Sequence, residues 1–304
     1  MDPAPGQQSS KAGAFRARLF STLILWGVVV GVFLSGNFAA VVVLVSLLGA
    51  LGCVELYRLT QSIPGRDCRI WALLVSLVFL GVLAWAFACG CEVSERLVEG
   101  FRLEMGALVL VLLGAFAIRL RHEITGPESV YPVAMAGFAF LYVPVLFASF
   151  TIRLTHFPVE LVSVQAGLSL VLLLAIATKF TDMGAYLVGS LIGKHKAIPH
   201  VSPAKSWEGY IGSMLFTQAG AFAVYYLAGD DFGQLGSWVH VAVLAVLINL
   251  AASVGDLAES ILKRSLKVKD SGHMLPGIGG VLDLLDSLCF TMPVAYFYII
   301  IFVN

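Results

Sequence analysis

The feature that most constrains the fold is a series of long apolar runs, separated by short polar segments. Such runs approach the ~20 residues that an α-helix needs to cross the hydrocarbon layer of a bilayer. Inside a bilayer, backbone polar groups must be paired within the protein, which favours helices. The sequence therefore predicts an all-α, polytopic integral membrane protein with about nine transmembrane helices. The expected spans are 19–35, 37–54, 70–90, 105–118, 131–152, 162–180, 208–229, 238–255 and 287–303.

The distribution of Lys and Arg predicts which ends of these helices face the cytoplasm. With the N-terminus inside, sixteen of the 19 basic residues fall in inner segments, and the outer segments hold only Arg96, Arg102 and Arg153. This orientation places residues 181–207 and 256–286 together on the cytoplasmic face of the cell (inner) membrane. We interpret residues 1–18 as a cytoplasmic tail and the apolar run after it as an uncleaved first helix.

Composition excludes some classes of function. The formal net charge is zero, so no global basic field favours nucleic acid as a partner. The five cysteines form no C-x-x-C pair, and we interpret them as small apolar packing residues. In the outer loop 91–104, the acidic residues are expected to form a solvated rim. They are Glu92, Glu95, Glu99 and Glu104.

Charge and glycine are concentrated in residues 253–287, between two apolar runs. If Asp256 opens a helix, Glu259, Lys263 and Lys267 follow near the same face, so a metal could bind at one end and phosphates further along. Asp283 and Asp286 are three apart and could share a face of a second helix. Between these segments, the loop 276–280 includes Gly279 and Gly280, whose N–H groups could face an anion. Carboxylates, cations and a glycine loop are what a Mg²⁺-nucleotide site requires.

A second polar region spans residues 178–209. Asp182 lies at the end of an apolar run, where an acid is costly unless it faces water, a cation or a partner. The spaced glycines that follow it favour close helix packing. Ser202 and Ser206 offer hydroxyls and Lys205 a charge, a combination suited to phosphate oxygens. Glu208 near a helix start could instead serve a structural role.

These two regions resemble the motifs of phosphatidate cytidylyltransferases (CDP-diacylglycerol synthases). One motif reads Lys269-Asp-Ser-Gly, then Leu275-Pro-Gly-Ile-Gly-Gly-Val-Leu-Asp-Leu-Leu-Asp-Ser, and the other ends in Ser202-Pro-Ala-Lys-Ser-Trp-Glu-Gly. The resemblance covers about residues 178–290. The chain departs from the family pattern at Ile278, usually His, and Leu284, usually Arg, and Ser206 replaces Thr.

The resemblance implies that CTP and phosphatidic acid react to give CDP-diacylglycerol and pyrophosphate, with Mg²⁺ as cofactor. It assigns Asp256 and Asp283 as metal ligands, with Asp286 orienting Asp283 or completing the coordination. Asp256, Asp283 and Lys205 are then the expected catalytic residues. The other expected phosphate-binding or substrate-binding residues are Ser202, Ser206, Lys263, Arg264, Lys267, Gly279, Gly280 and Asp182, the last holding a second cation or organising the basic loop.

The resemblance also predicts a homodimer, in contact with membrane lipids. We divide the chain into N-terminal membrane helices, 19–160, and a C-terminal catalytic membrane domain, 161–304. Two alternatives stay open: a cytidylyltransferase that acts on another lipid phosphate, and a membrane transporter that uses Asp182 and Asp256. An inactive structural relative is a third.

Overall fold

The computed structural model describes residues 24, 26–89, 92–124, 126–156, 164–229, 232, 237–268, 271–272 and 279–303. This part of the chain is built from helices, and eight of its helical segments are long and apolar enough to cross a membrane. The chain is therefore an all-α polytopic membrane protein, as predicted. The main helices are α2 (Phe38–Leu59), α3 (Arg66–Cys89), α5 (Arg102–Arg119), α6 (Tyr131–Phe140), α7 (Phe150–Thr155), α8 (Val164–Ile192), α9 (Trp207–Ala228), α10 (Trp238–Ser265), α11 (Leu282–Leu285) and α12 (Leu288–Phe302). Short elements are η1 (Thr60–Ser62), α4 (Glu92–Val98), η2 (Glu99–Phe101), η3 (Pro127–Ser129) and η4 (Leu141–Ser149).

The eight spans correspond to the second to ninth predicted spans. Part of the first, 19–35, lies outside the described residues, but residues 26–34 are helical. The predicted break at Ser35-Gly36-Asn37 is confirmed. Gly36 has a φ of 67°, a left-handed conformation that glycine adopts without steric cost. Asn37 then caps α2, because its side chain accepts a hydrogen bond from the Ala40 N–H.

Two spans differ in detail from the predicted ranges. The short run 105–118 extends at its N-terminal end, so that α5 begins at Arg102. The run 131–152 is one span made of α6, η4 and α7 in succession. Its middle part, η4, is π-helical and contains Pro144. Proline has no N–H for the helical ladder, and π-helical widening is one way that a helix accommodates such a defect.

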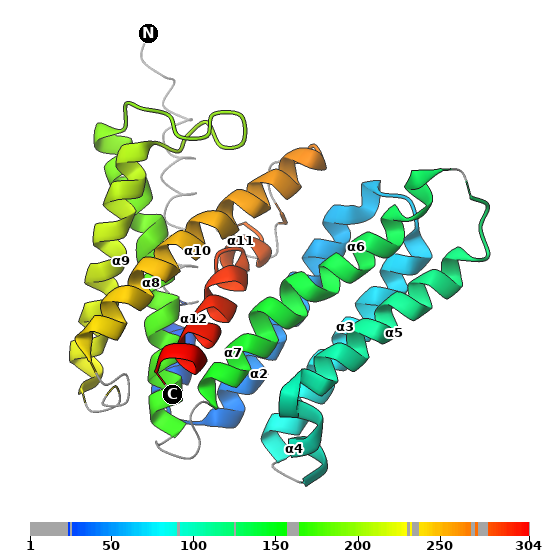
Figure 1. The fold of residues 1–304 in the computed structure, drawn as a ribbon, viewed down its shortest axis with the longest axis horizontal. Coiled ribbons are helices and arrows are strands. Elements are labelled where there is room, and N and C mark those ends of the chain that lie inside the picture. The colour runs from blue at the N-terminus through cyan, green and yellow to red at the C-terminus, as the bar shows by residue number, and fades with distance from the viewer. Residues whose placement is uncertain are drawn as a thin grey trace, which may run out of the picture.

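Close contact between α8 and α9 depends on glycine. A Cβ atom on Gly212 would lie 2.4 Å from the Cβ of Val188, and one on Gly184 would lie 2.6 Å from the Cβ of Phe216. Any side chain at these positions would force the helices apart. Figure 1 shows α8, α9 and α10 on one side of the molecule and α2, α3, α5 and α6 on the other, with α11 and α12 between them.

The predicted cytoplasmic segments lie at one end of the helical bundle. In Figure 1 the α8–α9 connection, the α2–α3 turn and the α5–α6 connection are all at the top, and α4 is at the opposite end. This arrangement brings the basic connections together at one surface. The division at residues 160 and 161 stays a prediction.

The expected solvated rim is wrong for Glu104, whose side chain is fully buried. Its Oε1 pairs with the Nη2 of Arg153 at 2.7 Å and accepts from the Ser149 hydroxyl. The guanidinium of Arg153 also lies over the ring of Phe101, 4.1 Å from its centroid. Because α5 begins earlier than predicted, Glu104 belongs to a packed helix, where a buried carboxylate requires a charged or hydrogen-bonding partner.

Candidate active site

A polar cavity of about 670 Å³ lies among α8, the α8–α9 connection, α9, α10 and the segment that begins with α11. This volume is in the range of small-molecule binding sites. Eight of the twelve residues predicted from the sequence line it. They are Asp182, Ser202, Lys205, Ser206, Asp256, Lys263, Asp283 and Asp286.

The start of α9 positions Ser206 at the wall of this cavity. The Ser206 hydroxyl is the N-cap of α9 and accepts from the Gly209 N–H at 3.2 Å. A Cβ atom on Gly189 of α8 would lie 3.2 Å from that hydroxyl oxygen. The spaced glycines of α8 therefore allow the loop to approach the helix, as the packing interpretation predicted.

Glu208 has a structural partner outside the cavity. Its Oε1 lies 2.6 Å from the Nδ1 of His195, and both of its oxygens accept from the His195 N–H. These contacts tie the start of α9 to the loop that precedes it. They support the structural role for Glu208, and they place His195 at the exposed surface.

An ion pair joins the two polar regions of the sequence. The Nζ of Lys205, from the α8–α9 connection, lies 2.5 Å from the Oδ2 of Asp256 on α10. The side chain of Lys205 is only 17% exposed, so solvent screens this pair less than a surface pair. Residues 51 positions apart thus meet at one wall of the cavity.

Three carboxylates converge beside this pair. One oxygen from each of Asp256, Glu259 and Asp286 lies within 4.8 Å of the others. The Oε1 of Glu259 is buried and has no hydrogen-bond partner among the described residues. Since a buried carboxylate oxygen is costly without a donor or a cation, this cluster fits a hard divalent cation with oxygen ligands.

Lys263 organises the next part of the wall. Its Nζ lies 2.7 Å from the Oε2 of Glu259 and 2.9 Å from the Oδ1 of Asp283. The second oxygen of Asp283 accepts from the Gly280 N–H at 2.9 Å. Asp283 therefore lines the cavity with one carboxylate oxygen paired with Lys263 and the other hydrogen-bonded to the Gly280 N–H.

Comparisons with known proteins agree on one family. The model of the "Cytidylyltransferase family" matches residues 16–302. The chain belongs to the cytidylyltransferase family. It is 29% identical over 266 residues to a phosphatidate cytidylyltransferase of Bacillus subtilis, covering 86% of this chain and 88% of the relative. The Haemophilus influenzae phosphatidate cytidylyltransferase is 30% identical over 258 residues, 83% of this chain and 88% of that protein. The one from Mycobacterium leprae is 41% identical over 180 residues, 58% of this chain and 53% of that protein.

Family membership does not by itself assign roles to the predicted residues, and these roles stay predictions. Of the predicted metal ligands, Asp256 and Asp286 lie in the three-carboxylate cluster. Asp283 lines the same cavity but is paired with Lys263. Glu259 takes the third place in the cluster. The spacing of Asp256 and Glu259 predicted that the two share a helix face near a metal, but Glu259 was not among the predicted ligands.

The other four predicted residues are not among those that line the cavity. Arg264 and Lys267 are exposed near the end of α10. Gly279 has a φ of 117°, and a Cβ atom there would lie 2.7 Å from the Oδ2 of Asp283. Gly280 directs its N–H to Asp283. Both glycines thus support Asp283, and Ile278 lies outside the described residues.

Sequence reasoning missed Glu55, which comes from α2 in the N-terminal half. Its side chain is buried, and its Oε2 accepts from the Leu282 N–H at the start of α11 at 2.8 Å. A Cβ atom on Gly280 would lie 2.7 Å from the same oxygen. Glu55 therefore holds the segment that carries Asp283 against α2, across 227 residues of sequence.

Proposed function

We propose that the chain catalyses the reaction of CTP with phosphatidic acid to give CDP-diacylglycerol and pyrophosphate, with Mg²⁺ as cofactor. Support comes from the family and from the phosphatidate cytidylyltransferases that resemble the chain over most of its length. Further support comes from the cavity, because its acids and bases suit a metal-dependent reaction between two phosphates.

The observation that carries this proposal is the contact between Lys205 and Asp256 beside the carboxylate cluster. It brings a loop whose Ser202 and Lys205 side chains suit phosphate oxygens next to a carboxylate cluster that suits a cation. Both line one cavity large enough for a nucleotide. A structural ion pair alone would not require such a cavity.

In this reaction one P–O bond forms and one P–O bond breaks. An oxygen of the lipid phosphate attacks the α-phosphorus of CTP and forms a new P–O bond. The bond from that phosphorus to the oxygen shared with the β-phosphate breaks, and pyrophosphate leaves with the electron pair. The lipid supplies the nucleophile, so the protein's contribution is to position the two reactants and to stabilise negative charge.

Both reactants are anions, and their repulsion is the main obstacle to approach. We assign Lys205 and Ser202 to phosphate oxygens, since a charge and a hydroxyl bind them well. Lys263 would also act on phosphate oxygens, and Glu259 and Asp283 hold it in place. Asp182, which pairs with Lys179 at 3.5 Å, keeps its predicted role toward a second cation or the basic loop.

Asp256, Glu259 and Asp286 would hold Mg²⁺, which neutralises phosphate charge when it is bound. The orphaned oxygen of Glu259 supports this assignment. The resemblance assigns Asp283 as a ligand as well. Its contacts with Lys263 and Gly280 favour a role in orienting that lysine.

We place the cavity on the cytoplasmic side of the cell (inner) membrane, where CTP is available. The excess of Lys and Arg in the connections at that end of the bundle supports this orientation. Phosphatidic acid would reach the cavity from the bilayer, with its acyl chains in lipid. A homodimer stays a prediction.

The test is an assay of purified protein in detergent with labelled CTP, Mg²⁺ and a panel of lipid phosphates. We expect CDP-diacylglycerol and pyrophosphate in equal amounts with phosphatidic acid. Faster turnover of a polyprenyl or ether-linked lipid phosphate would favour the alternative substrate. Solute flux across sealed vesicles without consumption of CTP would favour the transporter and contradict the proposal.

A further inference from the structure

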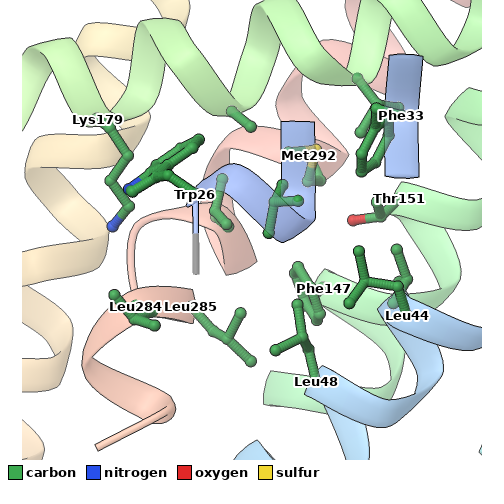
Figure 2. Close-up of a pocket in the computed structure, with 15 residues that line it drawn as sticks. Trp26, Phe33, Leu44, Leu48, Phe147, Thr151, Lys179, Leu284, Leu285 and Met292 are labelled. Atoms are coloured by element: carbon green, nitrogen blue, oxygen red, sulfur yellow. The ribbon is translucent and has the colours of Figure 1, made fainter. Parts of the chain in front are cut away.

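A second cavity, of about 80 Å³, lies beside the polar one. Figure 2 shows its side chains converging from five sides: the helix that precedes α2, α2 itself, the η4–α7 segment, α8 and the α11–α12 segment. Among the described residues that line it, Thr151 and Lys179 are polar and the others are hydrophobic. We call it the apolar cavity.

The short helix α11 separates the two cavities. Leu284 and Leu285 line the apolar cavity, whereas Asp283, in the same turn, lines the polar one. Asp286, which follows α11, also lines the polar cavity. This short helical segment thus presents leucine side chains to the apolar cavity and carboxylates to the polar cavity.

Lys179 marks the boundary between the two cavities. It lines the apolar cavity, and its side chain extends from α8 toward Leu284 in Figure 2. Its ammonium lies 3.5 Å from the Oδ2 of Asp182, which lines the polar cavity. This separation is longer than the 2.5–2.9 Å of the lysine pairs at Lys205 and Lys263, so a stronger anion can compete for Lys179.

We propose that the apolar cavity binds the first methylene groups of one acyl chain of the lipid substrate, while its phosphate lies in the polar cavity near Lys179. This inference rests on the proposed function for the identity of the lipid. A molecule that carries a phosphate on a hydrocarbon chain matches the two cavities. Its phosphate can lie in the polar cavity and its chain in the apolar cavity, and the link between them passes the edge of α11.

The size of the cavity limits what it binds. Its volume is about half that of the ~150 Å³ apolar cavity that accepts benzene in a protein core. A short piece of chain fills it, and the rest of the chain stays in the bilayer. The subsite therefore recognises the part of the lipid next to the glycerol, and total chain length has little effect.

For a lipid that comes from the bilayer, the cavity contributes mainly by orienting the phosphate and adds little to the binding free energy. Lipid tails are about as apolar as leucine side chains, so the transfer of a methylene from bilayer to cavity releases little free energy. Fixing the first methylenes instead limits how the phosphate can point. A short-chain lipid taken from water gains affinity as well, because each methylene then leaves water.

The variant Leu48→Trp tests the proposal, because Leu48 lines the cavity from α2, away from the carboxylates. The matched control is Leu47→Trp on the same helix, where Leu47 is 54% exposed on the outer face. With dihexanoyl phosphatidic acid as substrate, we expect Leu48→Trp to raise the KM for the lipid about fourfold for each methylene that it keeps out. The KM for CTP should stay unchanged, and Leu47→Trp should leave both KM values unchanged.

A direct readout does not depend on turnover. Phosphatidic acid with a diazirine beside one ester carbonyl should label residues of the apolar cavity, such as Phe147 and Met292, in the wild-type protein in nanodiscs. Leu48→Trp should abolish this label. If the two tryptophan variants behave alike, or if label falls only on outer helix faces, the proposal is wrong. Labelling of the cavity in a protein that lacks CTP-dependent turnover would overturn the proposed function and support the lipid subsite.

Discussion

The contact between Glu55 and α11 yields a quantitative prediction. In Glu55→Ala, the Leu282 N–H loses an acceptor that is 1% exposed, and Gly280 loses the carboxylate against which it packs. A buried hydrogen bond to a charged acceptor contributes about 1.5–3 kcal/mol. We therefore expect the free energy of unfolding in detergent to fall by about that amount.

Activity should fall with stability, because the segment that carries Asp283 is held to α2 by Glu55. If that segment moves, Lys263 loses its position between Glu259 and Asp283. If the same 1.5–3 kcal/mol is lost from the stabilisation of the transition state, kcat falls by about 13- to 160-fold. Turnover of labelled CTP and phosphatidic acid measures kcat, and denaturant unfolding followed by tryptophan fluorescence measures stability.

The matched variant is Glu55→Gln, whose amide oxygen can still accept from the Leu282 N–H. We expect it to recover most of the lost kcat. Wild-type kcat and stability in Glu55→Ala would refute the positioning role. A Glu55→Gln protein as impaired as Glu55→Ala would show that the negative charge matters, and that the hydrogen bond to Leu282 does not.

Three further predictions test other contacts. Lys205→Ala should raise the KM for CTP or lower kcat at least tenfold, and unchanged kinetics would reject its role at phosphate. Glu259→Gln should raise the Mg²⁺ concentration for half-maximal turnover about tenfold or more, with weaker Mn²⁺ binding by electron paramagnetic resonance; equal Mn²⁺ affinity would remove Glu259 from the cation site. Gly212→Val should lower the free energy of unfolding by about 1–3 kcal/mol, because its Cβ would overlap Val188. Gly81→Val, where the added Cβ has no neighbour within 4 Å, should leave it unchanged.

Much of the fold follows from local properties of the sequence. The apolar runs predicted helices, because a bilayer leaves the backbone few other structures, and the turn at Gly36 was visible as a short polar break. The two motif regions were expected to meet because charge placed both at the same membrane face. Their contact through Lys205 and Asp256 agrees with that expectation.

The roles of several acidic residues depend on tertiary contacts that the sequence alone does not predict. Glu55 and Glu104 are single acids next to apolar runs, and their partners lie 227 and 49 residues away. No spacing rule links such pairs. The place of Glu259 in the carboxylate cluster, and the pairing of Asp283 with Lys263, depend on how α11 packs against α10.

The central claim is that Asp256 and Lys205 belong to one Mg²⁺-dependent site for CTP and a lipid phosphate. The most direct measurement is CDP-diacylglycerol formation by purified wild-type and Asp256→Asn proteins, each with Mg²⁺ and with excess chelator. We predict product only from the wild type with Mg²⁺, while Asp256→Asn inserts and unfolds like the wild type. Equal product from Asp256→Asn, or from the wild type in chelator, would contradict the claim.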